Sequence, residues 1–376
     1  MKFFLPRFPL PPFVVILATL IAPMASAQDP SIERLLKKLP PPEKLVKPSV
    51  ARAIDQPDPA LRDPLVSQIA SAAQSNNLGR ALELARKLSA KHPKSAGAEC
   101  LRGMLALIAR QYGEATTAFR SSTSIQPGFA MSHFGLAGVA VAQGRYGAAV
   151  PHLRTLTRLE PKYFFGWMAL SECAIRSGHK QEGVETARRA TALAPSAPDA
   201  WLQLARAENA SGNAEASLIA LNRGAEVSPD NAAIMATVGF GYINLNRIPQ
   251  AIPPLQRAAR LAPKDFLVHA QLGYCLQATG QLDAAIRHLR LGASLAPKSY
   301  GPVWDHLGVA YQKKGLHRDA VKAFERATQI MPGYRLAWQH LAEEYRALGQ
   351  MSEANRAAAR AQSLPGRPSG SKPRKG

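Results

Sequence analysis

The stretch that decides the fold reads Trp304-x-x-Leu307-Gly308-x-x-Tyr311-x-x-x-Gly315-x-x-x-x-Ala320-x-x-x-Phe324-x-x-Ala327-x-x-x-x-Pro332. Apolar residues recur in it at intervals of three and four, which is the spacing of one face of an α-helix. Gly315 interrupts the pattern near its middle, where a glycine favours a turn between two helices. Pro332 ends it, because proline cannot continue a helix. The stretch therefore predicts a hairpin of two helices joined by a short turn.

The same pattern returns along the chain with a period of 34 residues. Prolines mark the period at Pro93, Pro127, Pro161, Pro195, Pro229, Pro263 and Pro297, and Pro332 follows after one residue inserted near Tyr300. Nine repeats result, and they begin near Arg62, Ala96, Ala130, Phe164, Pro198, Ala232, Phe266, Gly301 and Arg335. Self-similarity at such a period is typical of proteins that grow by adding hairpins rather than globular domains.

Other positions keep the same phase when each repeat is counted from 1 to 34. Position 15 is glycine in six repeats, position 20 is small in all nine, and position 8 is small from the second repeat on. Small residues at 8 and 20 let the two helices of a hairpin approach closely, and large residues such as Trp304 and Phe324 fill the space beside that contact. One hairpin cannot bury its own apolar faces, so the repeats must stack. The predicted fold class is an all-α solenoid of about nine helix-turn-helix repeats.

These signature positions resemble the tetratricopeptide repeat, and the resemblance covers roughly residues 62–365. The first two repeats depart from it most, because Leu65 and Glu99 stand where an aromatic residue is usual. The resemblance implies a right-handed superhelix in which the first helix of each repeat lines a concave groove. It also implies that this groove binds other molecules.

The N-terminus has the three parts of a secretory signal peptide, over residues 1–27. Lys2 and Arg7 form the basic end, an apolar run follows over residues 13–21, and Ala25-Ser26-Ala27 offers a cleavage site. We therefore expect export to the periplasm or cell envelope, with an uncleaved N-terminal anchor as the alternative. Residues 28–61 are rich in proline and charge and predict a tether. Residues 366–376 predict a basic, disordered tail.

Motifs of enzymes and cofactor sites are missing from the sequence. It holds no phosphate-binding loop, dinucleotide fingerprint, nucleophile elbow, His-x-x-x-His or Cys-x-x-Cys. We therefore expect no catalytic, cofactor-binding or metal site. His306 and His340 share one repeat position and could hold a metal together, although two separate polar side chains are the simpler interpretation. The three cysteines, Cys100, Cys173 and Cys275, are interpreted as small buried apolar residues.

The chain is strongly basic, with 47 Lys and Arg against 26 Asp and Glu and a formal net charge of +21. Such a charge attracts anionic partners over a long range, and acidic proteins or an anionic envelope polymer would both satisfy it. A solvated basic surface that only aids solubility is the alternative interpretation. Nucleic acid fits the charge but not the signal peptide, so we place it last.

The residues predicted to line the groove lie at positions 2, 5, 6, 9, 12 and 13 of each first helix, as the family resemblance implies. The candidates are Met104, Phe134, Phe165, Met168, Gln203, Arg206, Phe240, Gln271, Tyr274, His306 and His340. The earlier members are mostly apolar and suit an amphipathic helix, or they simply pack between neighbouring helices. The later members include a ladder of amides and imidazoles at position 6, which suits an extended peptide backbone. Polar residues on an exposed helix face need no function at all.

The function predicted from these features is a non-catalytic protein–protein interaction scaffold that acts in the periplasm or cell envelope through the groove. The alternative is a binding module for an anionic non-protein ligand, such as a cell-wall polymer or an exported polysaccharide. Charge is the only direct support for that alternative.

Overall fold

The computed structural model describes residues 58–364, and every regular element in that range is a helix. The predicted all-α fold is confirmed. The predicted signal peptide, the tether up to residue 57 and the basic tail lie outside the described residues. No helix within residues 58–364 is both long enough and apolar enough to cross a membrane.

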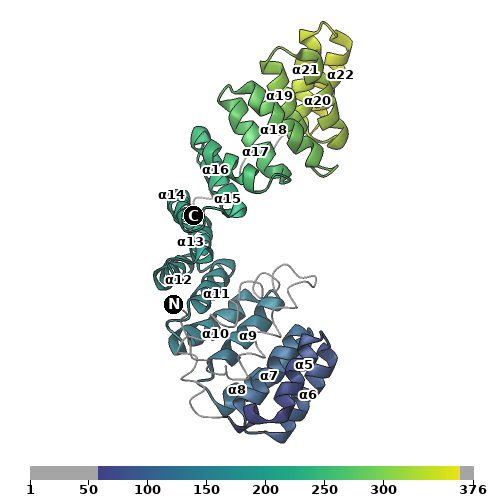
Figure 1. Ribbon diagram of the computed structural model, residues 1–376. Helices are drawn as coiled ribbons and strands as arrows, with labels where there is room; N and C mark the ends of the chain where they lie inside the picture. Colours follow the sequence, from purple (N-terminus) through teal and green to yellow (C-terminus); the bar gives the residue numbers. More distant parts are fainter. Residues whose placement is uncertain (1–57, 365–376) are drawn as a thin grey trace, which may run out of the picture. The chain divides into compact units, whose positions relative to one another are not determined.

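The chain divides into two compact units, and the boundary follows Gly212. The described helices of the N-terminal unit are η2 (Pro59–Arg62), α5 (Pro64–Gln74), α6 (Leu78–Lys91), α7 (Ala96–Ile108), α8 (Tyr112–Ile125), α9 (Ala130–Ala142), α10 (Tyr146–Leu159), α11 (Phe164–Arg176), α12 (Lys180–Leu193) and α13 (Pro198–Ala210). Consecutive helices pack side by side, and the first helices of neighbouring repeats also touch, as α7 does with α9 (Figure 1).

The C-terminal unit is built in the same way. Its described helices are α14 (Ala214–Val227), α15 (Ala232–Asn244), α16 (Ile248–Leu261), α17 (Phe266–Ala278), α18 (Leu282–Leu295), α19 (Pro302–Lys313), α20 (His317–Ile330), α21 (Arg335–Ala347) and α22 (Met351–Ser363). The first helices α15, α17, α19 and α21 contact one another in sequence. Each unit therefore stacks helical hairpins, and the boundary between the units separates α13 from α14, the two helices of the fifth repeat.

The turn inside each hairpin needs a residue with a left-handed backbone. The glycines at position 15 take φ values between 70° and 89°, as at Gly144 and Gly178. The three repeats without glycine there use Asn76, Arg110 and Asn246 with φ values of 57–59°. Asparagine tolerates this conformation, whereas arginine is strained in it.

Close contact between the two helices of a hairpin depends on the small residue at position 8. A Cβ added at Gly308 would lie 2.4 Å from Cε1 of Phe324, which stands at position 24 of the same repeat. Gly239 against Leu255 and Gly273 against Leu289 repeat the arrangement, each at 2.5 Å. The predicted pairing of small with large residues therefore forms the core.

In five repeats the residue at position 4 binds the loop before the hairpin. The indole N–H groups of Trp167, Trp201 and Trp338 donate to the carbonyl oxygens of Pro161, Pro195 and Pro332 at 2.8–3.0 Å. The periodic prolines thus end one helix and also supply the acceptor that holds the next. Histidine replaces the tryptophan at His133 and His269, and Nε2 of each ring lies 3.0–3.1 Å from the equivalent proline carbonyl.

Candidate partner-binding face

The first-helix face consists of the side chains at positions 2, 5, 6, 9, 12 and 13 of each first helix. In the C-terminal unit, the predicted members Phe240, Gln271, Tyr274, His306 and His340 are all partly exposed. The rings of Tyr274 on α17 and His306 on α19 are 5.1 Å apart between centroids. Two neighbouring repeats therefore place an aromatic ring and an imidazole side by side on this face.

A buried carboxylate organises the end of the face. Asp305 on α19 is 1% exposed, and its Oδ1 lies 2.8 Å from Nδ1 of His340 on α21. The hydroxyl of Tyr334 donates to the other oxygen of Asp305 at 3.2 Å. The ring of His340 also lies 5.2 Å from that of Phe324. These contacts fix the His340 ring and leave its Nε2 atom as the free polar atom of the imidazole.

The two imidazoles of the face differ in basicity. Burial lowers the pKa of His306 below its ordinary value, so this ring is neutral near pH 7. Burial also acts to lower the pKa of His340, but the hydrogen bond and charge of Asp305 outweigh it and raise the pKa above its ordinary value. His340 is thus the more basic imidazole of the two and His306 the less basic one. The sequence alone treated them as equivalent, because both stand at position 6.

The face of the N-terminal unit is apolar and aromatic. Met104, Phe134 and Phe165 are partly exposed, as predicted members of the face must be if they are to touch a partner. Tyr163 joins two of them, with its ring centroid 6.3 Å from that of Phe134 and 5.9 Å from that of Phe165. Tyr163 is not among the predicted members, because it directly precedes the fourth repeat, which was expected to begin near Phe164. Aromatic residues at the same point of other repeats, such as Phe129 and Tyr334, were the available signal.

Two predicted members lie inside the stack. Met168 is 8% exposed and Gln203 is 4% exposed. The amide nitrogen of Gln203 donates to Oγ of Ser171 at 3.1 Å and to Oε2 of Glu172 at 3.3 Å. Gln203 therefore joins α13 to α11 through hydrogen bonds, while the exposed Arg206 one turn later remains at the surface.

The described residues offer little reactive chemistry. Burial raises the pKa of Cys100 and Cys173 to about 12 and that of Cys275 to about 11, which keeps the three thiols protonated and unreactive at neutral pH. All three are buried and unpaired, and they lie in separate repeats. Within residues 58–364, no group of three or more His, Cys, Asp or Glu side chains is placed to hold a metal ion.

Comparison with known proteins identifies the repeats. A family model described as tetratricopeptide repeat matches residues 126–295, and a second model of the same description matches residues 301–334. The crystal structure of MamA is similar at 23% identity and a TM-score of 0.41, over 42% of this chain and 92% of that one. The MamA structure from Desulfovibrio magneticus RS-1 shares 18% identity with a TM-score of 0.42, over 44% and 94% of the two chains.

The crystal structure of YrrB, described as a TPR protein with an unusual peptide-binding site, is 19% identical with a TM-score of 0.45, over 49% of this chain and 95% of that one. At these levels of identity the likenesses concern the helical-repeat fold alone. No curated protein matches the sequence.

Proposed function

The chain belongs to the tetratricopeptide-repeat family, and from this premise we propose that it is a non-catalytic scaffold that binds protein partners through its first-helix face. We also propose that it acts in the periplasm or cell envelope.

The first-helix face of the C-terminal unit is the main support for the proposal. Tyr274, His306 and His340 come from three consecutive first helices that touch one another, and all three side chains are partly exposed. The imidazoles offer hydrogen-bond donors and acceptors, and the tyrosine offers an aromatic surface. Each of the three repeats contributes one of these side chains. Such a row suits an extended peptide, because backbone groups recur along a peptide as these side chains recur along the stack.

The apolar face of the N-terminal unit supports a second kind of contact. Met104 and Phe134 present flexible and aromatic apolar surface, and the methionine adapts its shape to what it touches. An amphipathic helix of a partner is the segment that such a surface accommodates.

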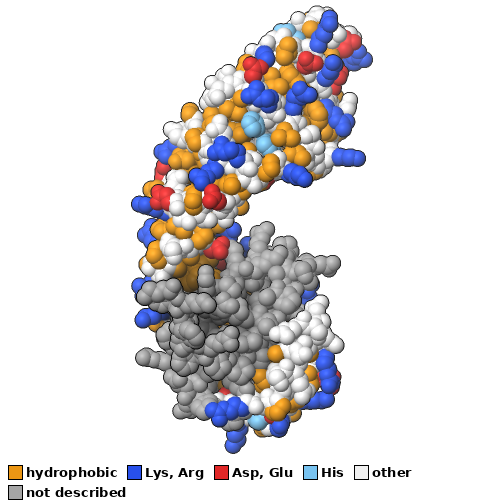
Figure 2. Space-filling view, in the orientation of Figure 1, with side chains coloured by type: hydrophobic (Ala, Val, Ile, Leu, Met, Phe, Trp, Pro, Cys, Tyr) orange, Lys and Arg blue, Asp and Glu red, His pale blue; other side chains and the backbone are white. Residues whose placement is uncertain are grey.

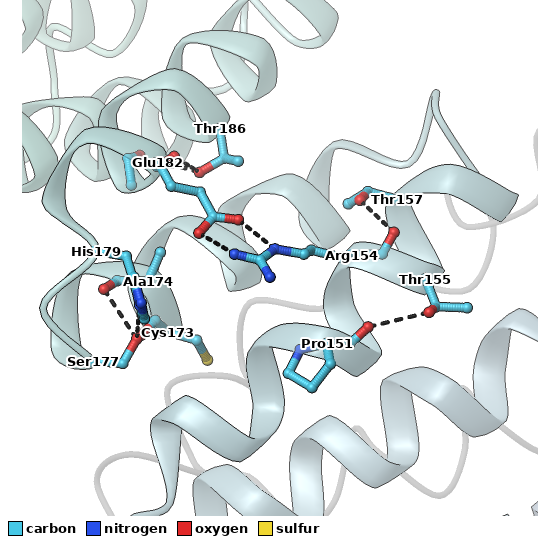
Figure 3. Close-up of polar contacts among 11 residues, drawn as sticks. Pro151, Arg154, Thr155, Thr157, Cys173, Ala174, Ser177, His179, Glu182 and Thr186 are labelled. Atoms are coloured by element: carbon cyan, nitrogen blue, oxygen red, sulfur yellow. Dashed lines mark hydrogen bonds and ion pairs between the residues drawn. The ribbon is translucent and has the colours of Figure 1, made fainter.

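The anionic-polymer alternative gains less support from the arrangement of charge. Arginine stands at position 25 or 26 of every repeat. Several of these side chains are paired with carboxylates, namely Arg86 with Glu114, Arg154 with Glu182, Arg188 with Glu208, Arg223 with Glu226 and Arg257 with Asp230. In the pair between α10 and α12, Arg154 donates two hydrogen bonds of 2.7 Å to the carboxylate of Glu182 (Figure 3). A guanidinium that is paired with a carboxylate is less available to hold a polymer.

The place of action rests on residues 1–27 of the sequence. Cell fractionation, followed by N-terminal sequencing of the purified protein, tests it. A mature chain that begins at Gln28 and fractionates with the envelope supports the proposal. A cytoplasmic chain that retains Met1 refutes this part of it.

Photo-crosslinking in living cells tests the binding face. A photoreactive residue replaces Tyr274 or His306 on first helices, and Gln256 or Arg290 at exposed sites on second helices serves as the matched control. We expect a discrete crosslinked protein from the first-helix sites alone. Crosslinks that arise only from the second-helix sites would place the partner on the other face and refute the proposal.

A further inference from the structure

A pair of histidines lies inside one hairpin of the C-terminal unit, outside the first-helix face. His269 stands at position 4 of α17, and His288 stands on the partner helix α18. Their Nδ1 atoms are 3.0 Å apart. His269 is 4% exposed, whereas His288 is half-buried and open to solvent. Histidine side chains are visible at the surface over α17 and α18 (Figure 2).

Hydrogen bonding decides which nitrogen of His269 carries the proton. Its Nε2 atom lies 3.1 Å from the carbonyl oxygen of Pro263, and a carbonyl can only accept, so Nε2 carries the hydrogen. Nδ1 of the neutral ring therefore keeps a lone pair directed at His288. Metal-binding histidines use this arrangement, in which a backbone carbonyl holds one ring nitrogen and fixes the other as a ligand.

The spacing of the two Nδ1 atoms fits a shared ion. Metal–nitrogen bonds of about 2.0–2.1 Å that meet at roughly 90–110° place the nitrogens about 2.9–3.4 Å apart. The observed 3.0 Å lies within this range. The ring centroids are 5.3 Å apart and the ring planes differ by 19°, so the two Nδ1 atoms face each other, and each ring must turn by about 40° for its lone pair to point at a shared ion. We propose that His269 and His288 form a two-histidine site for a first-row transition-metal ion, with Cu²⁺ bound most tightly.

The chemistry of the pair is compatible with an incoming cation. A metal ion binds the neutral imidazole, and His288 is half-buried and open to solvent, so an ion can reach the pair. Binding needs the His288 proton to move from Nδ1 to the solvent side at Nε2, with no net release of protons. Because residues 58–364 provide no cluster of three ligands here, water completes the coordination.

A second hairpin repeats the arrangement four repeats earlier. His133 on α9 and His152 on α10 occupy the same two repeat positions, and Nε2 of His133 lies 3.0 Å from the carbonyl oxygen of Pro127. Nδ1 of His133 is buried and has no hydrogen-bond partner. The ring centroids are 6.1 Å apart, which is longer than in the first pair. We therefore assign this pair as a weaker site of the same kind.

Residues found at the same position of other repeats can replace either histidine and keep the fold. His269→Trp retains a ring N–H for the Pro263 carbonyl, as Trp201 does for Pro195, but removes the Nδ1 ligand. His288→Ala introduces the residue that Ala220 and Ala323 provide at the same repeat position. The exposed His179 supplies the matched control, His179→Ala.

The test is Cu²⁺ binding by the full chain, measured by titration calorimetry and electron paramagnetic resonance in metal-free buffer. Far-UV circular dichroism checks that each variant is folded. We expect His269→Trp and His288→Ala each to weaken the tightest Cu²⁺ binding by roughly tenfold or more and to remove the two-nitrogen coupling of that tightest site from the spectrum, while His179→Ala changes neither. Equal Cu²⁺ affinity in all four proteins would overturn the proposal and leave the pair as a plain N–H···N hydrogen bond.

Discussion

His340 and Asp305 form a buried ion pair that joins the first helices of the last two repeats, with 2.8 Å between Nδ1 and Oδ1. Asp305 is buried, and its two oxygens contact this imidazole and the hydroxyl of Tyr334. The pair makes the end of the first-helix face rigid and gives it a response to pH.

The first prediction concerns that response. The pKa of His340 is raised in the folded protein, so its contribution to stability is complete below the unfolded pKa of about 6.5 and is lost as the pH rises through the folded pKa. We expect His340→Ala to lower the free energy of unfolding by about 3 kcal/mol at pH 5.5. The loss should be smaller at pH 9. Urea unfolding at the two pH values measures this, and a loss that is equal at both would contradict the ion pair.

The second prediction concerns the turn of the second repeat. Arg110 has a φ of 59°, a conformation that costs a non-glycine residue about 1–2 kcal/mol. We expect Arg110→Gly to stabilise the chain by about 0.5–1 kcal/mol, because the relief of strain exceeds the added entropy of the unfolded state. Gly280→Ala, at the same position of another repeat with a φ of 81°, should destabilise. Thermal unfolding of both variants measures this: the melting temperature should rise for Arg110→Gly and fall for Gly280→Ala. Shifts of the same sign in both variants would contradict the explanation.

The third prediction concerns the helix contact in the eighth repeat. A methyl group at Gly308 would overlap Phe324, so Gly308→Ala should cost about 2 kcal/mol. Gly79→Ala is the matched control, because Gly79 lies on α6 with open space around it and should stabilise by about 0.5 kcal/mol. Adding Phe324→Leu to Gly308→Ala should recover part of the loss, since the two sites are coupled. Simple additivity of the two losses would show that the contact is not the cause.

The sequence was sufficient for features that each repeat encodes locally. Gly144 stands at the turn position and Gly308 at the helix-contact position. Each repeat needs a small residue at both positions, so the period of the sequence predicts both features. Contacts between side chains of different repeats could not be predicted from the period alone. His306 and His340 share a repeat position, yet only His340 meets a carboxylate, because position 5 of the preceding repeat is Asp305 for His340 and Ala270 for His306.

Burial on the first-helix face was equally hard to predict. Gln203 stands at the same position as the partly exposed Gln271, but it turns inward because Ser171 and Glu172 offer it acceptors. The contact between His269 and His288 was also missed, because the two residues are far from the spacing of any metal motif and meet only across the hairpin.

Substitutions on opposite faces of the stack, followed by measurement of the chain's affinity for its crosslinked partner, test partner binding by the first-helix face. Tyr274→Ala and His306→Ala change the first-helix face, and Ile219→Ala removes the most exposed large apolar side chain, which is 64% exposed on the second helix α14. We expect each first-helix variant to weaken binding by roughly tenfold and Ile219→Ala to leave it unchanged, with all three variants unfolding cooperatively as folded proteins do. Loss of binding in Ile219→Ala, with full affinity in the other two, would contradict partner binding by the first-helix face.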